Sequence, residues 1–155
     1  MHHDFGQFMQ DVAPQVERAL VAAYGVEVGV EAAAEAMALA WERWEEIAVL
    51  HNPAGYLYRV GQSRARPHVR WVRRKAVFAP TSHTSAAEAG DPDLGELFSA
   101  LARLGRDQRV AVVLVRMYGF SYAEAADVMC VSPAAVTNHI HRGMSALRRL
   151  MGVTR

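Results

Sequence analysis

Apolar residues recur every three or four positions along most of the chain, which is the period of an amphipathic α-helix. Two such stripes precede residue 47, separated by a break between Gly25 and Gly29, and Pro14 interrupts the first of them. The stripes consist of Phe5, Phe8, Met9, Val12, Val16, Leu20 and Ala23, and of Ala33, Ala36, Met37, Ala40, Trp41 and Trp44. The pattern predicts two helices that bury these residues, with both tryptophans in the core.

A third helix is predicted after residue 52. Asn52 is a favoured N-cap and Pro53 suits the first helical turn. The helix should bury its next apolar positions, which are Tyr56, Leu57 and Val60. It should then continue into a basic stretch, with a bend or a break at Pro67.

Periodicity disappears between Ala76 and Asp93, where small residues and turn formers dominate. We therefore expect a flexible linker over residues 77–93, between helical domains at residues 1–76 and 94–155. The second domain opens with a helical stripe of Leu94, Leu97, Phe98, Leu101 and Leu104, followed by a helix from about Asp107 to Met117.

Two further helices are predicted near the C-terminus. Ser121 and Glu124 have the spacing of a capping box, and the helix that they begin should run to Met129. Ser132 should cap the last helix, which turns Val136, Ile140, Met144 and Leu147 inward. A turn of about three residues between two helices is typical of a helix-turn-helix, and the predicted fold class is all-α.

Composition narrows the class of protein. The chain has 155 residues, of which 52% are hydrophobic, so we expect a folded protein of one or two small domains. Its single cysteine, Cys130, excludes an internal disulfide and a four-cysteine metal site. The apolar runs are too short to span a bilayer and the start does not resemble a signal peptide, so we expect a cytoplasmic protein without membrane contact.

Charge is sorted along the chain, although the formal net charge is only +1. Acidic residues are frequent before Ile47 and absent from Ile47 to Ala87. The acid-free segment contains Arg59, Arg64, Arg66, Arg70, Arg73, Arg74 and Lys75. A solvated face is the simpler interpretation, but unpaired cations that repel one another favour a nucleic acid, which would release counterions on binding.

The outward face of the last helix is the second candidate for DNA contact. Asn can pair with adenine, Arg with guanine or phosphate, and Thr with a thymine methyl group. The outward positions are Ala134, Asn138, His141, Arg142 and Ser145, with Thr137 at the border of this face. The alternative is a solvated helix in an ordinary bundle. We find no paired carboxylates, phosphate loop or nucleophile constellation, so we expect no enzyme activity, no cofactor and no metal.

Two blocks of sequence resemble extracytoplasmic-function (ECF) sigma factors. The segments 120–126, 131–136 and 142–148 (FSYAEAA, VSPAAV and RGMSALR) are similar to region 4 of that family. The segments 40–44 and 53–60 (AWERW and PAGYLYRV) are similar to region 2. The order of the blocks, their separation and the chain length also match, and together they cover nearly the whole chain.

The resemblance implies an alternative sigma factor that binds RNA polymerase core and promoter DNA, with an anti-sigma factor as a further candidate partner. The largest subunit's clamp helices would contact Glu31, Glu35, Leu39 and Glu42, and the flap of the second-largest subunit would hold the second domain. The −35 element would be read by Ser132, Pro133, Ala134, Ala135, Thr137, Asn138, His141 and Arg142. The −10 element would be melted and read by Ile47, His51, Asn52, Tyr56, Arg59, Gln62, Ser63, Arg66, Arg70, Arg73 and Arg74.

Some positions depart from the family pattern. The glutamine of the clamp-binding helix is missing from residues 31–35, Ser63 stands where asparagine is common, and Thr137 to His139 replace a basic-serine-arginine triplet. These departures leave two alternatives open. One is a sigma mimic that occupies an anti-sigma factor or polymerase without starting transcription. The other is an ordinary helix-turn-helix repressor, which leaves the first domain unexplained.

Overall fold

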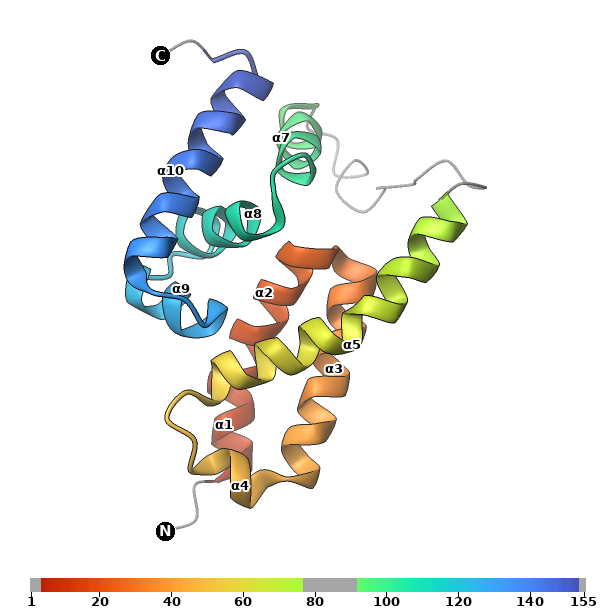
Figure 1. The fold of residues 1–155 in the computed structure, drawn as a ribbon, viewed down its shortest axis with the longest axis vertical. Helices are drawn as coiled ribbons and strands as arrows, with labels where there is room; N and C mark the ends of the chain where they lie inside the picture. The colour runs from red at the N-terminus through yellow and green to blue at the C-terminus, as the bar shows by residue number, and fades with distance from the viewer. Residues whose placement is uncertain (1–3, 77–91, 154–155) are drawn as a thin grey trace.

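The computed structural model describes the backbone of residues 4–76 and 92–153, and the side chains of 4–67 and 95–153. Every regular element in these ranges is a helix, which confirms the all-α prediction. The elements fall into an N-terminal and a C-terminal bundle that lie against each other (Figure 1). Residues 77–91 of the expected linker lie outside the described residues, and a helix already begins at Pro92.

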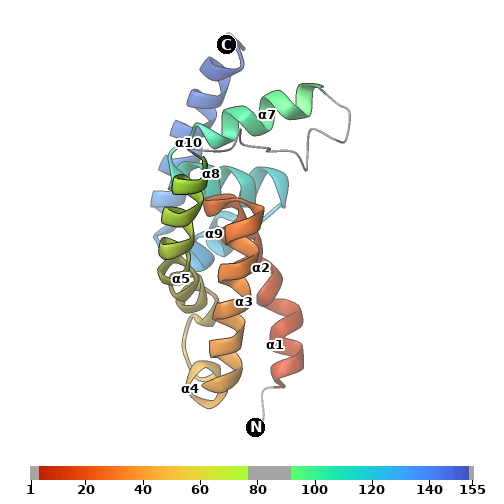
Figure 2. The ribbon, with the colours of Figure 1, turned by 90° about the vertical axis from the view of Figure 1, so that its right-hand side faces the viewer.

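The N-terminal bundle contains five helices. They are α1 (Phe5–Asp11), α2 (Ala13–Tyr24), α3 (Val26–Glu42), α4 (Trp44–Ala48) and α5 (Pro53–Ala76). α2 and α3 pack side by side, and α5 crosses both of them, as Figures 1 and 2 show from two sides. Pro14 lies in the first turn of α2, which agrees with the predicted interruption.

The sequence predicted a break between helices from Gly25 to Gly29, and this prediction is wrong at Gly29. Gly25 separates α2 from α3, but Gly29 lies inside α3 and is buried. A Cβ on Gly29 would lie 2.5 Å from both Cα and N of Val21. The glycine therefore allows the backbones of α2 and α3 to approach closely, and it does not end a helix.

Asn52 caps α5, as predicted. The Gly55 N–H donates to Asn52 Oδ1 at 3.1 Å, and α5 continues through Pro67 without a break. Leu57 is fully buried, but Tyr56 is 37% exposed, so the predicted burial of Tyr56 is wrong. The adjacent Tyr58 is the buried tyrosine of this helix, with 2% exposure.

The two tryptophans differ in environment. Trp44 is half-buried, and its ring lies 4.8 Å from that of Phe8 and 5.2 Å from that of Phe5. The Trp41 ring packs edge to face with that of Phe5, with centroids 4.9 Å apart, but Trp41 is 67% exposed, so its predicted place in the core is wrong. Both indoles depend on α1, which supplies the phenylalanine rings.

The C-terminal bundle contains α7 (Pro92–Ala102), α8 (Arg106–Val112), the π-helical segment η1 (Val113–Met117), α9 (Tyr122–Met129) and α10 (Pro133–Leu150). α8 and η1 occupy the range predicted for one helix. α9 and α10 form the predicted helix-turn-helix, and α10 also packs on α8.

Side-chain caps fix the start of both helices of the helix-turn-helix. The Glu124 N–H donates to Ser121 Oγ at 3.0 Å, and the Ser121 N–H donates to Glu124 Oε2 at 2.9 Å, which confirms the capping box. The Ala135 N–H donates to Ser132 Oγ at 3.1 Å. In the turn, Cys130 adopts a left-handed conformation with φ 58° and ψ 45°.

The two bundles share one apolar core. Val16 and Leu20 of α2 belong to the same cluster of buried side chains as Val110 of α8, Leu114 of η1 and Val128 of α9. All five are at most 1% exposed. The bundles are therefore joined by packing as well as by the chain between them.

We predict that Cys130→Gly is more stable to unfolding than Cys130→Ala by about 1 kcal/mol, because a Cβ is strained at positive φ and glycine is not. Both variants lack the thiol, so the comparison isolates the backbone conformation. The measurement is urea denaturation of both proteins. An alanine variant as stable as the glycine variant would show that the turn is not left-handed at residue 130.

Candidate nucleic-acid interface

α10 presents a polar face to solvent. Val136, Ile140 and Leu147 face the core with at most 6% exposure, as predicted. The residues expected to face outward are exposed at Ser132, Pro133, Ala134, Thr137, Asn138, His141 and Arg142, and half-buried at Ala135 and Ser145. Thr137 uses its hydroxyl inside the helix, donating to the Pro133 carbonyl at 3.1 Å.

The chemistry of this face suits a nucleic acid. Asn138 and Arg142 are four residues apart, so they lie one above the other on the same side of α10. α10 contains no Asp or Glu, and Arg148 and Arg149 lie in its last turn. The face therefore offers amide and guanidinium groups that can pair with base edges, within a surface that attracts phosphate.

The second candidate surface lies on α5 and the loop before it. His51, Tyr56, Arg59, Ser63 and Arg66 are exposed, whereas Asn52 and Gln62 are half-buried. Ile47 is 2% exposed, so its side chain belongs to the core and is not placed to touch DNA. Arg70, Arg73 and Arg74 lie on α5, beyond the residues whose side chains are described.

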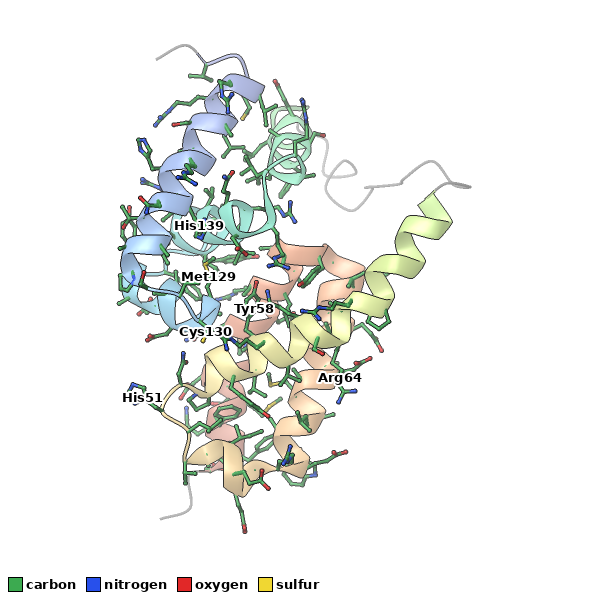
Figure 3. The ribbon with its side chains drawn as sticks, viewed as in Figure 1. His51, Tyr58, Arg64, Met129, Cys130 and His139 are labelled. Atoms are coloured by element: carbon green, nitrogen blue, oxygen red, sulfur yellow. The ribbon has the colours of Figure 1, made fainter. Side chains whose placement is uncertain are left out.

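The acidic residues of α3 adjoin this surface. Glu31 and Glu42 are exposed, and Glu35 and Leu39 are half-buried. Glu35 and Leu39 line an open pocket between α3 and α5, opposite Val60, Ser63, Arg64 and Pro67. Figure 3 shows Arg64 on the side of α5 that faces away from the C-terminal bundle. Residues predicted for two different partners, such as Leu39 and Ser63, thus line one pocket.

Arg109 of α8 joins the two bundles, a role that the sequence analysis missed. Its Nε donates to the Ala22 carbonyl at 2.6 Å and its Nη2 to the Ala23 carbonyl at 2.6 Å. The last carbonyls of a helix lack partners within the helix, so this guanidinium caps the C-terminus of α2. It also donates to the Leu104 carbonyl at 2.9 Å in its own bundle.

Asn52 forms a second link between the bundles. Its Nδ2 donates to the Asp127 carbonyl of α9 at 2.8 Å, while its Oδ1 caps α5. The backbone of α5 is close at this point, since a Cβ on Gly55 would lie 2.7 Å from the same carbonyl oxygen. A residue expected to meet DNA thus contacts the other half of the protein.

Tyr58 lies at the junction, on the side of α5 that faces the C-terminal bundle (Figure 3). Its hydroxyl is buried, and no hydrogen-bond partner has suitable geometry. Burial, and then the neighbouring Tyr24, raise the pKa of Tyr58 above its usual range, so the phenol stays neutral. Arg106 donates to the Tyr24 hydroxyl at 3.4 Å, and the Arg18 guanidinium lies 4.8 Å from the centre of the Tyr118 ring.

No pattern in the sequence indicated that these residues would join the two bundles. An arginine in a short helix is most often solvated, and Arg109 became recognisable only when the end of α2 was placed beside it. Burial lowers the pKa of Arg109, but a guanidinium remains charged at any physiological pH.

Among the described side chains of residues 4–67 and 95–153, no group of three or more His, Cys, Asp or Glu residues is arranged to hold a metal ion. No helix within those ranges is both long enough and apolar enough to cross a bilayer.

Residues 94–147 match the family model described as "Sigma-70, region 4". The chain is 31% identical over 103 residues to the RNA polymerase sigma factor CarQ of Myxococcus xanthus, covering 63% of this chain. It is 27% identical over 107 residues to the ECF RNA polymerase sigma factor EcfG of Rhodopseudomonas palustris (strain TIE-1), covering 66% of this chain. In each case the match spans 59% of the relative's length.

Two solved structures share the fold. One is the sigma factor RpoE in complex with the anti-sigma factor NepR from Bartonella quintana, with TM-score 0.68, 24% identity and coverage of 99% of this chain and 100% of that one. The other is CnrH in complex with the cytosolic domain of CnrY, with TM-score 0.61, 22% identity and coverage of 97% and 89%. Residues 94–147 are therefore similar to region 4 of sigma-70 factors, and the relatives that the chain resembles include an ECF RNA polymerase sigma factor.

Proposed function

We propose that this protein is an alternative sigma factor that binds RNA polymerase core and directs transcription initiation at promoters with a −35 and a −10 element. The observation that carries the proposal is the exposed face of α10, with Asn138 and Arg142, inside the region 4 match. Catalysis belongs to the polymerase, so the protein itself is not an enzyme.

Each surface has a proposed role. α10 reads the −35 element in the major groove, where every base pair presents a distinct pattern of donors and acceptors. The surface that includes His51, Tyr56 and Ser63 contacts the melted −10 element. The exposed arginines of α5 supply affinity for the backbone but no sequence choice.

The solved structures of similar fold suggest one further class of partner for this chain. RpoE was solved with the anti-sigma factor NepR, and CnrH with the cytosolic domain of CnrY. We include an anti-sigma factor among the partners of this chain on that basis. The acidic side of α3, with Glu31 and Glu42 exposed, is proposed to face the polymerase clamp, and the C-terminal bundle to face the flap.

Run-off transcription tests the proposal directly. Purified core polymerase is given genomic DNA fragments with and without this protein. A sigma factor yields transcripts with defined starts that are absent when the protein is omitted. Binding to core without any transcript would instead support the sigma mimic, and DNA binding without core binding would support a repressor.

Charge reversal of α3 should abolish binding to core polymerase. The variant is Glu31→Lys with Glu42→Lys, because both carboxylates are exposed and would face a basic clamp surface. We expect at least a hundredfold loss of affinity, measured by co-elution and fluorescence titration with labelled protein. The matched control is Asp11→Lys with Glu17→Lys, which makes the same change of charge at exposed positions of α1 and α2. Equal binding by the two double variants would contradict this role for α3.

Alanine at Asn138 should weaken binding to −35 duplex by about 1–3 kcal/mol and relax the choice of base at one position, if the amide pairs with a base. Alanine at Arg142 has the same effect when the guanidinium reads a base. When the guanidinium holds a phosphate, affinity for all DNA sequences falls alike. The slope of affinity against salt concentration then falls by the equivalent of about one phosphate contact. Arg103→Ala is the control, because Arg103 is exposed and lies between α7 and α8, outside α10. The measurement is fluorescence anisotropy at two salt concentrations. No change in affinity or specificity for either Asn138 or Arg142 would exclude this face from DNA reading.

A further inference from the structure

The part of α10 that is proposed to enter the major groove carries no permanent charge. From Val131 to His141 the sequence contains no Lys, Arg, Asp or Glu, and the first arginine of the helix is Arg142. The titratable side chains of this segment are His139, which is half-buried, and His141, which is exposed. Histidine changes its charge between about pH 5 and pH 8, so the charge that this face offers to DNA depends on pH.

We propose that His141 is a proton-dependent DNA contact. Its protonated imidazole binds a phosphate of duplex DNA, so the affinity of α10 for DNA rises as the pH falls. The inference rests on the proposed function, because it requires that α10 meets DNA. It goes beyond that function by assigning to the helix a response to pH, which an arginine at this position would not give.

His141 lies among neutral side chains on the outward face of α10. Thr137 and Asn138 precede it by four and three residues and are exposed, so they are its neighbours on the helix surface. Ser145, one turn further along, is neutral as well. Arg142 is adjacent in the chain and is also exposed. The phosphates that this guanidinium attracts therefore act on the imidazole beside it.

The elements packed on α10 give His141 no carboxylate partner. These elements are α7, α8 and α9. Their described charged side chains are Glu96, Arg106, Asp107, Arg109, Glu124 and Asp127. Arg106 pairs with Asp107, and the Glu124 carboxylate accepts from the Ser121 N–H. Within the part of the chain that the structure describes, no ion pair or hydrogen bond joins the His141 side chain to any of these groups. The phosphates of DNA can therefore supply the counter-charge.

The direction of the pH dependence follows from linkage between proton binding and DNA binding. A phosphate stabilises the charged imidazolium, so the DNA complex binds the proton more strongly than the free protein does. The added affinity is therefore present at low pH, and it is lost as the pH rises through the range in which the bound histidine deprotonates. One proton taken up on binding changes the affinity by at most about tenfold per pH unit.

The test uses the full chain and a duplex that the protein itself selects. The protein enriches a random pool of duplexes of about 20 base pairs, roughly two turns of B-DNA. A duplex is retained if Arg142→Ala weakens its binding, because such a DNA meets α10. Fluorescence anisotropy then gives the affinity for the fluorescein-labelled duplex at about pH 6 and pH 8, which bracket the titration of histidine, each at two salt concentrations.

Wild-type protein should bind about five- to tenfold more tightly at the lower pH. His141→Gln keeps a hydrogen-bonding side chain without the charge, so it should bind equally at both pH values. His141→Arg carries a permanent charge, so it should bind tightly at both. In the wild type, the slope of log affinity against log salt concentration should be steeper at the lower pH by about one phosphate contact. In the two variants the slope should not depend on pH.

The matched control is His139→Gln, which removes the half-buried imidazole two residues away and should keep the full pH dependence. If His141→Gln retains the pH dependence of the wild type, or if His139→Gln alone abolishes it, the assignment to His141 is wrong. Equal wild-type affinity at both pH values would also overturn the proposal, although DNA binding by α10 would then stand. If no enriched duplex is weakened by Arg142→Ala, the proposed DNA-reading role of α10 fails, and this inference fails with it. Circular dichroism checks that each variant is folded.

Discussion

The C-terminal end of α2 needs hydrogen-bond donors, and the other half of the protein provides them. The Ala22 and Ala23 carbonyls accept from Arg109, a side chain of α8 that also binds the Leu104 carbonyl in its own bundle. One guanidinium therefore satisfies the ends of two structural units. Around it, Leu20, Val110 and Val128 complete an apolar core to which both bundles contribute. The relative position of the two candidate DNA surfaces depends on this junction.

The two candidate surfaces differ in their position relative to the junction between the bundles. Asn52 caps α5 and contacts α9, so the start of the surface proposed for the −10 element is part of the contact between the bundles. The exposed face of α10 points to solvent and is independent of it. The first surface therefore adjoins the contact between the bundles, whereas the exposed face of α10 lies outside it.

Local signals in the sequence predicted much of the fold. The Ser121–Glu124 capping box, the Asn52 cap and the inward stripe of α10 were all readable, because each depends on residues within one or two turns. The outward set of α10 was readable for the same reason. Once the apolar stripe of a helix is known, the remaining positions are the ones exposed to solvent, and the candidate residues lie there.

The errors concern contacts between elements that are distant in sequence. Gly29 resembled a helix break, but its purpose is the close approach of α3 to Val21 of α2. Trp41 has the spacing of a core residue, yet it contacts Phe5 of α1 and remains 67% exposed. The role of Arg109 depends on two carbonyls more than 80 residues earlier in the chain, and no local pattern carries that information.

In the free protein, the two bundles share one apolar core. Differential scanning calorimetry of the intact protein tests it most directly. A shared core should unfold in one transition, with the calorimetric enthalpy equal to the van't Hoff enthalpy. Two separate transitions, or a calorimetric enthalpy about twice the van't Hoff value, would show that the bundles unfold independently and would contradict the account.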